Sequence, residues 1–297
     1  MKQGFIYAIC AYFMWGLLPL YWKLFASLSA WEILSHRIFW SFLSISIVVT
    51  LTIGWEKIKQ SITNRKQILA IVACSFLIAM NWVIFIWAVN VDRVIETSLG
   101  YYINPLINVV AGVLLLKEKL HKGQWVAITV AGLGVSIMAF EYGQVPWVSL
   151  SLAVSFALYG YFKKSLQVAP MVGLLWETLI VFPLALIYLM YLQSQGTETF
   201  FHLSLPIQLA LAAAGIATLL PLLWFAEAAK RLPLSTVGFI QYLAPTTSLL
   251  LAIFLFHEPF TQTELFSFSL IWVSLAIYSF STWKTQAKRP IPKEMSA

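Results

Sequence analysis

Glu32, His36 and Arg37 stand together in the segment WEILSHRIFW, at the start of a long apolar run. Residues four apart share one face of a helix, so Glu32 and His36 are expected one turn apart, with Arg37 offset by about 100° from its neighbour. An ionisable side chain inside lipid costs about 2.5–3.5 kcal/mol, so it normally faces a partner or a water-filled cavity. The trio predicts a site at which Glu32 or His36 exchanges a proton and Arg37 holds an anionic group. The alternative is an ion pair that only fixes the end of the helix.

A related pattern occurs in the second half of the chain. A WG pair followed by WE, containing Trp15 and Glu32, is echoed at nearly equal spacing by YG followed by WE, containing Tyr159 and Glu177. No basic residue lies within a helical turn of Glu177, so its partner must come from another helix, a ligand or water. We predict that Glu177 exchanges a proton and that Trp15 and Tyr159 contact a ligand.

Asn81 and Trp82 lie in the middle of another apolar run. Together they could present a hydrogen-bonding amide and a flat apolar ring to a cavity, so both are predicted to bind a ligand. The alternative for the amide is a hydrogen bond between helices, which is worth about 0.6–2 kcal/mol in a membrane.

Two further segments repeat each other: GYYINPLINVVAGVLLLKEKL, from Gly100, and FIQYLAPTTSLLLAIFLFHEPF, from Phe239. In each, a tyrosine precedes a proline by three positions, and a glutamate follows that proline at the same distance. Each proline removes a backbone hydrogen bond and kinks its helix, which frees carbonyl groups near a binding site; a packing kink without a ligand is the alternative. We read Glu118 and Glu258, the two glutamates, as structural. The predicted cavity-lining residues are Tyr101, Tyr102, Asn104, Gln241 and Tyr242, and the predicted kinks are at Pro105 and Pro245.

The composition shows what kind of element must position these residues. Apolar residues make up 60% of the chain and charged residues 10%, against about 45–50% and about 25% in soluble domains. Lipid must therefore solvate most of the surface. The apolar runs are continuous and lack the alternation of a β-barrel strand, so they predict membrane-spanning helices.

The length of these runs predicts an all-α protein with ten transmembrane helices, since about 20 residues cross the hydrocarbon layer. The sixth span is short. The predicted spans are residues 4–26, 31–54, 68–90, 95–116, 123–140, 146–163, 171–192, 206–228, 234–256 and 264–283.

The net charge of +7 does not indicate a nucleic-acid partner, because the basic residues fall in short connections. Of the 19 lysines and arginines, all but Lys23, Arg37 and Arg93 lie at one set of ends and loops, Lys163 and Lys164 among them. By the positive-inside rule this side is cytoplasmic, and both termini lie on it. We read the last residues, 285–297, as a basic cytoplasmic tail.

The repeat divides the chain into residues 1–143 and 144–284, with five spans each. Because five is odd, the second copy starts on the opposite side of the membrane and is inverted. Inverted repeats are the architecture of secondary transporters, with a binding site near the midplane between the halves.

The repeated segments resemble the paired EamA domains of the drug/metabolite transporter superfamily. The motifs YFMWGLLPLYWK, EILSHR, NWVIFIWAVN, SLGYYINPL and GFIQYLAPT are similar to its RarD branch. The resemblance runs from about Gly4 to Phe280. It implies two inverted five-helix repeats, a bacterial cytoplasmic membrane and a transporter, but no particular substrate.

The expected function is therefore a multi-pass secondary transporter that exports a small metabolite or drug-like solute, such as an amino acid or an amphenicol-like compound, by alternating access. A passive channel and a non-transporting membrane scaffold or sensor are the alternatives. No phosphate-binding loop, serine nucleophile elbow or zinc-ligand spacing occurs, and Cys10 and Cys74 lie inside apolar runs. We thus expect no enzyme, cofactor or metal; the expected partners are the lipid bilayer and a small-molecule substrate, and the oligomeric state stays open.

Overall fold

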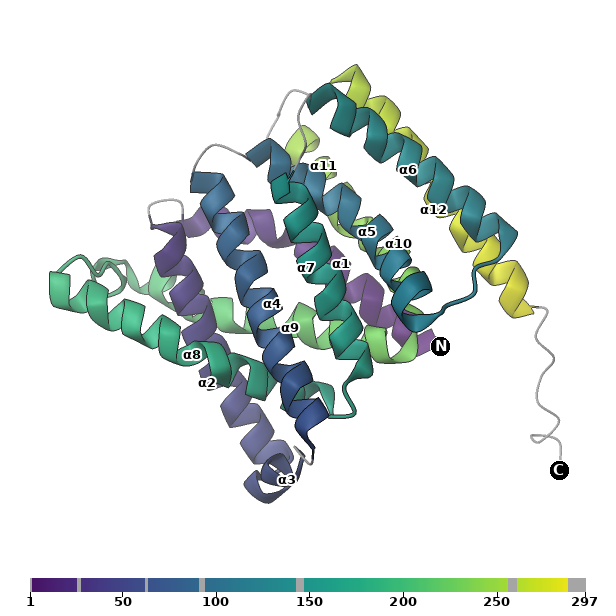
Figure 1. Cartoon of the computed structure of the whole chain (residues 1–297). Coiled ribbons are helices and arrows are strands. Elements are labelled where there is room, and N and C mark those ends of the chain that lie inside the picture. The colour runs from purple at the N-terminus through teal and green to yellow at the C-terminus, as the bar shows by residue number, and fades with distance from the viewer. Residues whose placement is uncertain are drawn as a thin grey trace.

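The computed structural model of the chain is all-helical (Figure 1). It describes residues 2–25, 28–61, 64–90, 94–142, 147–255 and 261–287. Short helices, α3 (Trp55–Gln60), η1 (Lys23–Phe25) and η2 (Phe200–His202), lie in connections. The long elements are α1 (Lys2–Trp22), α2 (Ala30–Thr52), α4 (Arg65–Asn90), α5 (Val94–Leu116), α6 (Lys122–Tyr142), α7 (Trp147–Ser165), α8 (Pro170–Gln195), α9 (Leu205–Arg231), the consecutive pair α10 (Leu234–Gln241) and α11 (Leu243–Phe254), and α12 (Gln262–Ala287).

Within the described residues, nine helical segments are long and apolar enough to cross a membrane, with α10 and the start of α11 counted as one. The tenth segment is α7, which has 19 residues and ends in Lys163 and Lys164. It is the predicted sixth span, and it packs against α4 and α5. The sequence predicted ten spans in an all-helical membrane fold; the fold is confirmed, with nine to ten spans.

The two halves pack through one another rather than side by side. Helix α5 of the first half packs on α7 of the second, and α1 correspondingly packs on α10 and α11. Likewise α4 packs on α7, and α1 packs on α9. Counterpart helices meet directly in the pairs α2–α8, α5–α10 and α6–α12, the last of which runs side by side in Figure 1. Such reciprocal contacts are what two inverted five-helix repeats produce.

Small residues allow these helices to approach closely. A Cβ atom on Gly16 would lie 2.8 Å from the carbonyl oxygen of Ala244, so α1 meets the backbone of α11. A Cβ on Gly215 would lie 2.4 Å from the carbonyl carbon of Trp40, where α9 meets α2. Close backbone contacts of this kind bind helices together in lipid, where no hydrophobic effect acts between them.

The two repeated prolines affect their helices differently. Helix α10 ends at Gln241 and α11 begins at Leu243. Pro245 cannot donate a hydrogen bond to the carbonyl of Gln241, and its ring crowds that group, so the helix breaks one turn earlier. By contrast, α5 continues from Val94 to Leu116 through Pro105.

Glu118 joins the two halves. Its carboxylate accepts hydrogen bonds from the backbone N–H groups of Leu234 (2.6 Å) and Ser235 (3.0 Å) and from the Ser235 hydroxyl (2.7 Å). It thereby caps the N-terminus of α10, where an anion is favoured by the helix dipole. Glu258, its counterpart in the repeat, lies outside the described residues.

Candidate functional site

Arg37 lies on α2, seven residues after the first residue, Ala30, and hence about 10 Å along the helix. Its guanidinium stands over two indole rings, 4.5 Å from the centroid of Trp22 and 5.0 Å from that of Trp82. Its Nε donates a hydrogen bond to the Thr218 hydroxyl on α9 (3.1 Å). Cation–π contacts and one neutral acceptor therefore hold the cation in place.

Arg37 has no carboxylate partner among the residues that the structure describes. Tyr21 and Tyr101 lie near the guanidinium. Tyr101 is 48% exposed, so its ring is not fully enclosed by protein. A partly buried guanidinium with neutral neighbours is suited to bind an anionic group from outside the protein.

Glu177 on α8 has the opposite arrangement. Its Oε1 atom lies 2.7 Å from Nζ of Lys163, with both side chains 3% exposed. The Tyr159 hydroxyl donates a hydrogen bond to its Oε2 atom (3.2 Å). The partner of Glu177 thus comes from another helix, α7. Lys163, which was counted among the basic residues of ends and loops, lies within the last turn of α7, and the pairing with Glu177 allows it to be buried.

A narrow cavity lies between these two charged sites. Its volume is about 20 Å³, which is room for roughly one water molecule. Trp82 and Thr218, which contact Arg37, line it together with Tyr159 and Glu177. In this conformation the two sites are therefore neighbours but are not joined by a passage for a larger solute.

An aromatic cluster packs beside this cavity and includes Trp15. The Trp15 ring lies 5.7 Å from that of Phe156 and 5.9 Å from that of Phe225. The Tyr159 ring stacks on Phe225, with centroids 5.8 Å apart and an angle of 15° between the planes. The repeat therefore brings Trp15 and Tyr159 into one cluster, in which both contact the same phenylalanine of α9.

The predicted polar residues of α5 and α10 form a small network. Asn108 donates hydrogen bonds to Asn104 (3.3 Å) and to Gln241 (2.5 Å), and its own carbonyl oxygen is buried without a partner in the described part of the chain. The sequence analysis missed Asn108, although its place one turn after Asn104 indicates a shared helix face. Tyr102 and Tyr242 are buried beside this network in an apolar cluster.

Asn81 connects α4 to α7. Its amide nitrogen donates hydrogen bonds to the carbonyl oxygen of Leu152 (2.9 Å) and to the Ser155 hydroxyl (3.0 Å). Both hydrogens of the amide are therefore engaged between helices. The structure places Asn81 in the role that the alternative interpretation gave it.

Glu32 and His36 share one face of α2, as their spacing indicates, but neither contacts Arg37. Oε1 of Glu32 accepts hydrogen bonds from the backbone N–H (3.1 Å) and the hydroxyl (2.6 Å) of Thr199. The His36 ring stacks on Phe200, with centroids 4.9 Å apart. No ion pair of Glu32 with Arg37 fixes the helix end in the described structure. These two residues contact the connection between α8 and α9 instead.

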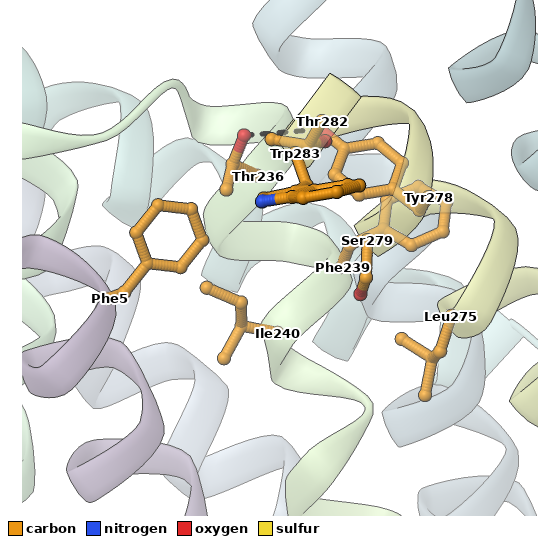
Figure 2. Close-up of a pocket in the computed structure, with 9 residues that line it drawn as sticks. All are labelled: Phe5, Thr236, Phe239, Ile240, Leu275, Tyr278, Ser279, Thr282 and Trp283. Carbon is orange, nitrogen blue, oxygen red and sulfur yellow. Dashed lines mark hydrogen bonds between the residues drawn. The ribbon is translucent and has the colours of Figure 1, made fainter. Parts of the chain in front are cut away.

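A larger cavity, of about 240 Å³, lies between the first turn of α1, helix α10 and the end of α12 (Figure 2). None of the predicted site residues lines it. Figure 2 shows its aromatic walls, with Tyr278 stacked on Phe239 at 3.8 Å and hydrogen-bonded to Thr236 at 3.2 Å. The side chains that line it are uncharged, so it offers a solute no ionic contact: Phe5, Thr236, Phe239, Ile240, Leu275, Tyr278, Ser279, Thr282 and Trp283.

Comparisons with known proteins agree on one family. The model of the EamA-like transporter family matches residues 2–140 and 146–280. A Bacillus subtilis protein named "Uncharacterized transporter YojE" is 47% identical, over 97% of each chain. "Protein RarD" of Escherichia coli is 40% identical over 97% of each chain, and "Chloramphenicol-sensitive protein RarD" of Pseudomonas aeruginosa is 26% identical over 97% of this chain and 98% of its own. A crystal structure with a TM-score of 0.70 and 17% identity, covering 93% of this chain and 97% of its own, shares the fold.

Proposed function

The chain belongs to the EamA-like transporter family, and from this premise we propose that it is a secondary transporter that exports a small metabolite or drug-like solute by alternating access. That it is a multi-pass membrane transporter rather than an enzyme follows from the family itself. The substrate, the direction of transport and the mechanism are what we add.

One observation carries the proposal: Arg37 lies inside the helical bundle without an anionic partner among the described residues. A cation at this depth costs free energy unless something compensates it. A carboxylate or another anionic group of the solute supplies that compensation, and the indoles of Trp22 and Trp82 supply flat apolar walls. A compact amino acid, above all an aromatic one, fits both the charge and these walls, whereas an uncharged amphenicol-like compound fits the walls alone.

The small cavity between Arg37 and Glu177 supports a carrier rather than a passive channel. A channel needs a continuous polar path, whereas only a cavity of about 20 Å³ lies between the surroundings of Arg37 and those of Glu177. In a carrier such a constriction is expected, because the solute must meet a closed barrier on one side at all times. The reciprocal packing of the two halves would let one half rock against the other.

We propose that Glu177 couples transport to a proton. It is buried, it forms an ion pair with Lys163 and accepts a hydrogen bond from Tyr159, and it lines the cavity of about 20 Å³. Proton binding to Glu177 would release Lys163 and loosen the contact between α7 and α8. For the solute itself we propose contacts with Arg37, Trp82 and Tyr101. The remaining predicted residues, Trp15, Asn81, Tyr102, Asn104, Gln241 and Tyr242, would then shape the site through their helix contacts.

We place the transporter in a bacterial cytoplasmic membrane. Its relatives are bacterial proteins, and most of its basic residues fall in the connections on one side of the bilayer, which is the cytoplasmic side under the positive-inside rule. Both termini would lie there. We also retain repeat boundaries at residues 1–143 and 144–284, followed by a cytoplasmic tail, 285–297.

The test is uptake by proteoliposomes of labelled amino acids and of chloramphenicol, with and without an imposed pH gradient. We expect saturable uptake of at least one anionic or zwitterionic solute, accelerated by the gradient. Arg37→Gln should strongly reduce the apparent affinity of this uptake, while Arg65→Gln, which removes an exposed arginine at the start of α4, serves as the matched control. Uptake that ignores Arg37→Gln would refute the substrate site, and uptake indifferent to the gradient would refute the proton coupling.

A further inference from the structure

Glu32, His36 and Glu198 form a cluster whose three metal-ligating atoms, one from each side chain, all lie within 4.8 Å of one another. Two of them belong to the first two turns of α2, and the third belongs to the connection between α8 and α9. The sequence analysis found no zinc-ligand spacing, because Glu198 is far from the other two in the chain.

His36 points to a ligand at this place. The side chain is 6% exposed, and both ring nitrogens are buried without a hydrogen-bond partner among the described residues. Stacking on Phe200 fixes the ring in this position. A buried nitrogen atom without a partner loses the hydrogen bonds that water would give it, at a cost of about 1–3 kcal/mol. Coordination to a cation would remove that cost for one nitrogen.

The two carboxylates are held in the manner of metal ligands. Oε1 of Glu32 is held by the backbone N–H and hydroxyl of Thr199, and Oε1 of Glu198 accepts a hydrogen bond from the backbone N–H of Phe201 (3.3 Å). Between described residues these hydrogen bonds all go to the Oε1 atoms, which leaves each Oε2 atom available. Outer contacts of this kind orient the first ligands of metal sites.

The charges also favour a cation. Glu32 and Glu198 have no lysine or arginine partner in the described structure. Two neighbouring carboxylates repel each other, and Glu32, which is 3% exposed, cannot be buried as an ion without compensation. A divalent cation would neutralise both at once. One imidazole and two carboxylates suit zinc and related first-row metals, with a fourth position left for water.

We infer that Glu32, His36 and Glu198 bind a divalent transition-metal cation, for which Zn²⁺ is the first probe. The cation joins the N-terminus of α2, in the first half, to the α8–α9 connection, in the second. This assignment is independent of the proposed transport function. It uses Glu32 and His36 as ligands instead of proton carriers, and it leaves Glu177 as the group for proton coupling.

The test is Zn²⁺ binding by the full chain, purified in detergent without a histidine tag and freed of metal with a chelator. Calorimetry should show one saturable site per chain. Glu198→Gln and His36→Asn should each weaken binding at least tenfold, since even outer-shell changes cost roughly 10–100-fold. His202→Gln, which changes an exposed histidine in the same connection, should leave the affinity unchanged.

A second measurement separates coordination from unfolding. With Co²⁺ in place of Zn²⁺, visible absorption bands of the bound metal should appear in the unaltered chain and in His202→Gln, and should be lost in His36→Asn. Glu198 is only partly buried, so its replacement should not disturb the fold. The assignment is overturned if no saturable site exists, or if either Glu198→Gln or His36→Asn binds Zn²⁺ as tightly as the unaltered chain.

Discussion

The surroundings of Arg37 and those of Glu177 solve the same physical problem in opposite ways. Each residue lies seven positions after the first residue of its helix, Ala30 in α2 and Pro170 in α8, and these helices pack against each other as counterparts. Under the inverted repeat that the sequence predicts, they would reach similar depths from opposite faces of the membrane. Glu177 is neutralised by Lys163 at 2.7 Å, whereas Arg37, within the part of the chain that the structure describes, is held by indole rings and a hydroxyl and not by a carboxylate.

The difference separates two roles that a transporter needs. A charge with a protein partner stabilises one arrangement of the helices, and breaking that pair changes the arrangement. A charge without one keeps its strongest interaction available for a solute. The two sites should therefore respond differently to substitution: the first mainly in stability, the second mainly in transport.

Removing one member of the Lys163–Glu177 ion pair should have the largest effect on stability. Lys163→Met leaves the Glu177 carboxylate buried without its cation, and such losses cost about 3–5 kcal/mol. Thermal unfolding in detergent should show a large decrease in stability. The double variant Lys163→Met/Glu177→Leu removes both charges and should recover most of it. If the double variant is no more stable than the single one, the pair is not the source of the loss.

Arg37→Gln should instead reduce transport with little change in stability. The guanidinium can form charge-assisted hydrogen bonds worth about 1.5–3 kcal/mol with an anionic solute. The loss corresponds to roughly 10–100-fold in apparent affinity, measured by uptake at varied solute concentration. Arg37→Lys should recover only part of the affinity, because an ammonium group lacks the planar fork. A large drop in unfolding temperature for Arg37→Gln would show that Arg37, like the Lys163–Glu177 pair, acts mainly on stability.

Trp82→Leu should weaken solute binding less than the loss of the charge does. The indole ring contributes a cation–π contact of about 0.5–2 kcal/mol, which orients Arg37. Equilibrium binding of a labelled solute should show a loss of roughly 2–30-fold. Trp283→Leu, at an exposed position at the end of α12, is the matched control. Equal affinities for Trp82→Leu and this control would show that the indole does not support the site.

Tyr159→Phe should lower stability less than Lys163→Met does, and it separates the contributions of the two partners of Glu177. It removes only the hydrogen bond from the phenol to Glu177 (3.2 Å), which is worth about 0.5–1.5 kcal/mol, or up to about 3 kcal/mol because the acceptor is charged. The stacking on Phe225 remains. Unfolding measurements should place this variant well above Lys163→Met in stability. A loss as large as that of Lys163→Met would mean that the tyrosine, rather than the lysine, compensates Glu177.

Much of the fold could be predicted from the sequence, because lipid forces each apolar run to satisfy its own backbone. The runs became helices, and α7, with 19 residues, is the predicted span that is not among the nine candidate spans of the described residues. The repeat predicted two halves but could not show that α5 packs on α7 and α1 on α11, since packing between halves leaves no local periodicity. Pro245 indicated the break before α11, but the sequence could not distinguish it from Pro105, through which α5 continues.

The site was less predictable for the same reason. Position in a connection suggested that Lys163 is solvated, yet a partner on α8 allows it to be buried. The repeat matched Glu177 with Glu32, whereas the residue at the corresponding depth is Arg37. Glu198 could not be linked to His36, because only the fold brings their segments together. Asn108 is the exception, since its spacing from Asn104 was visible in the sequence.

The crossed packing of the two halves has a consequence for how the protein is made. Helices α1 and α5 emerge from the ribosome well before α7, α9 and α11, against which they pack. Until those later segments are inserted, Arg37 lacks Thr218, and Glu32 lacks Thr199. The first half therefore waits in the bilayer as a group of unassembled helices with polar side chains that still lack their final contacts. Biogenesis thus requires a period of protection, by lipid or by the insertion machinery, that lasts until most of the second half has been synthesised.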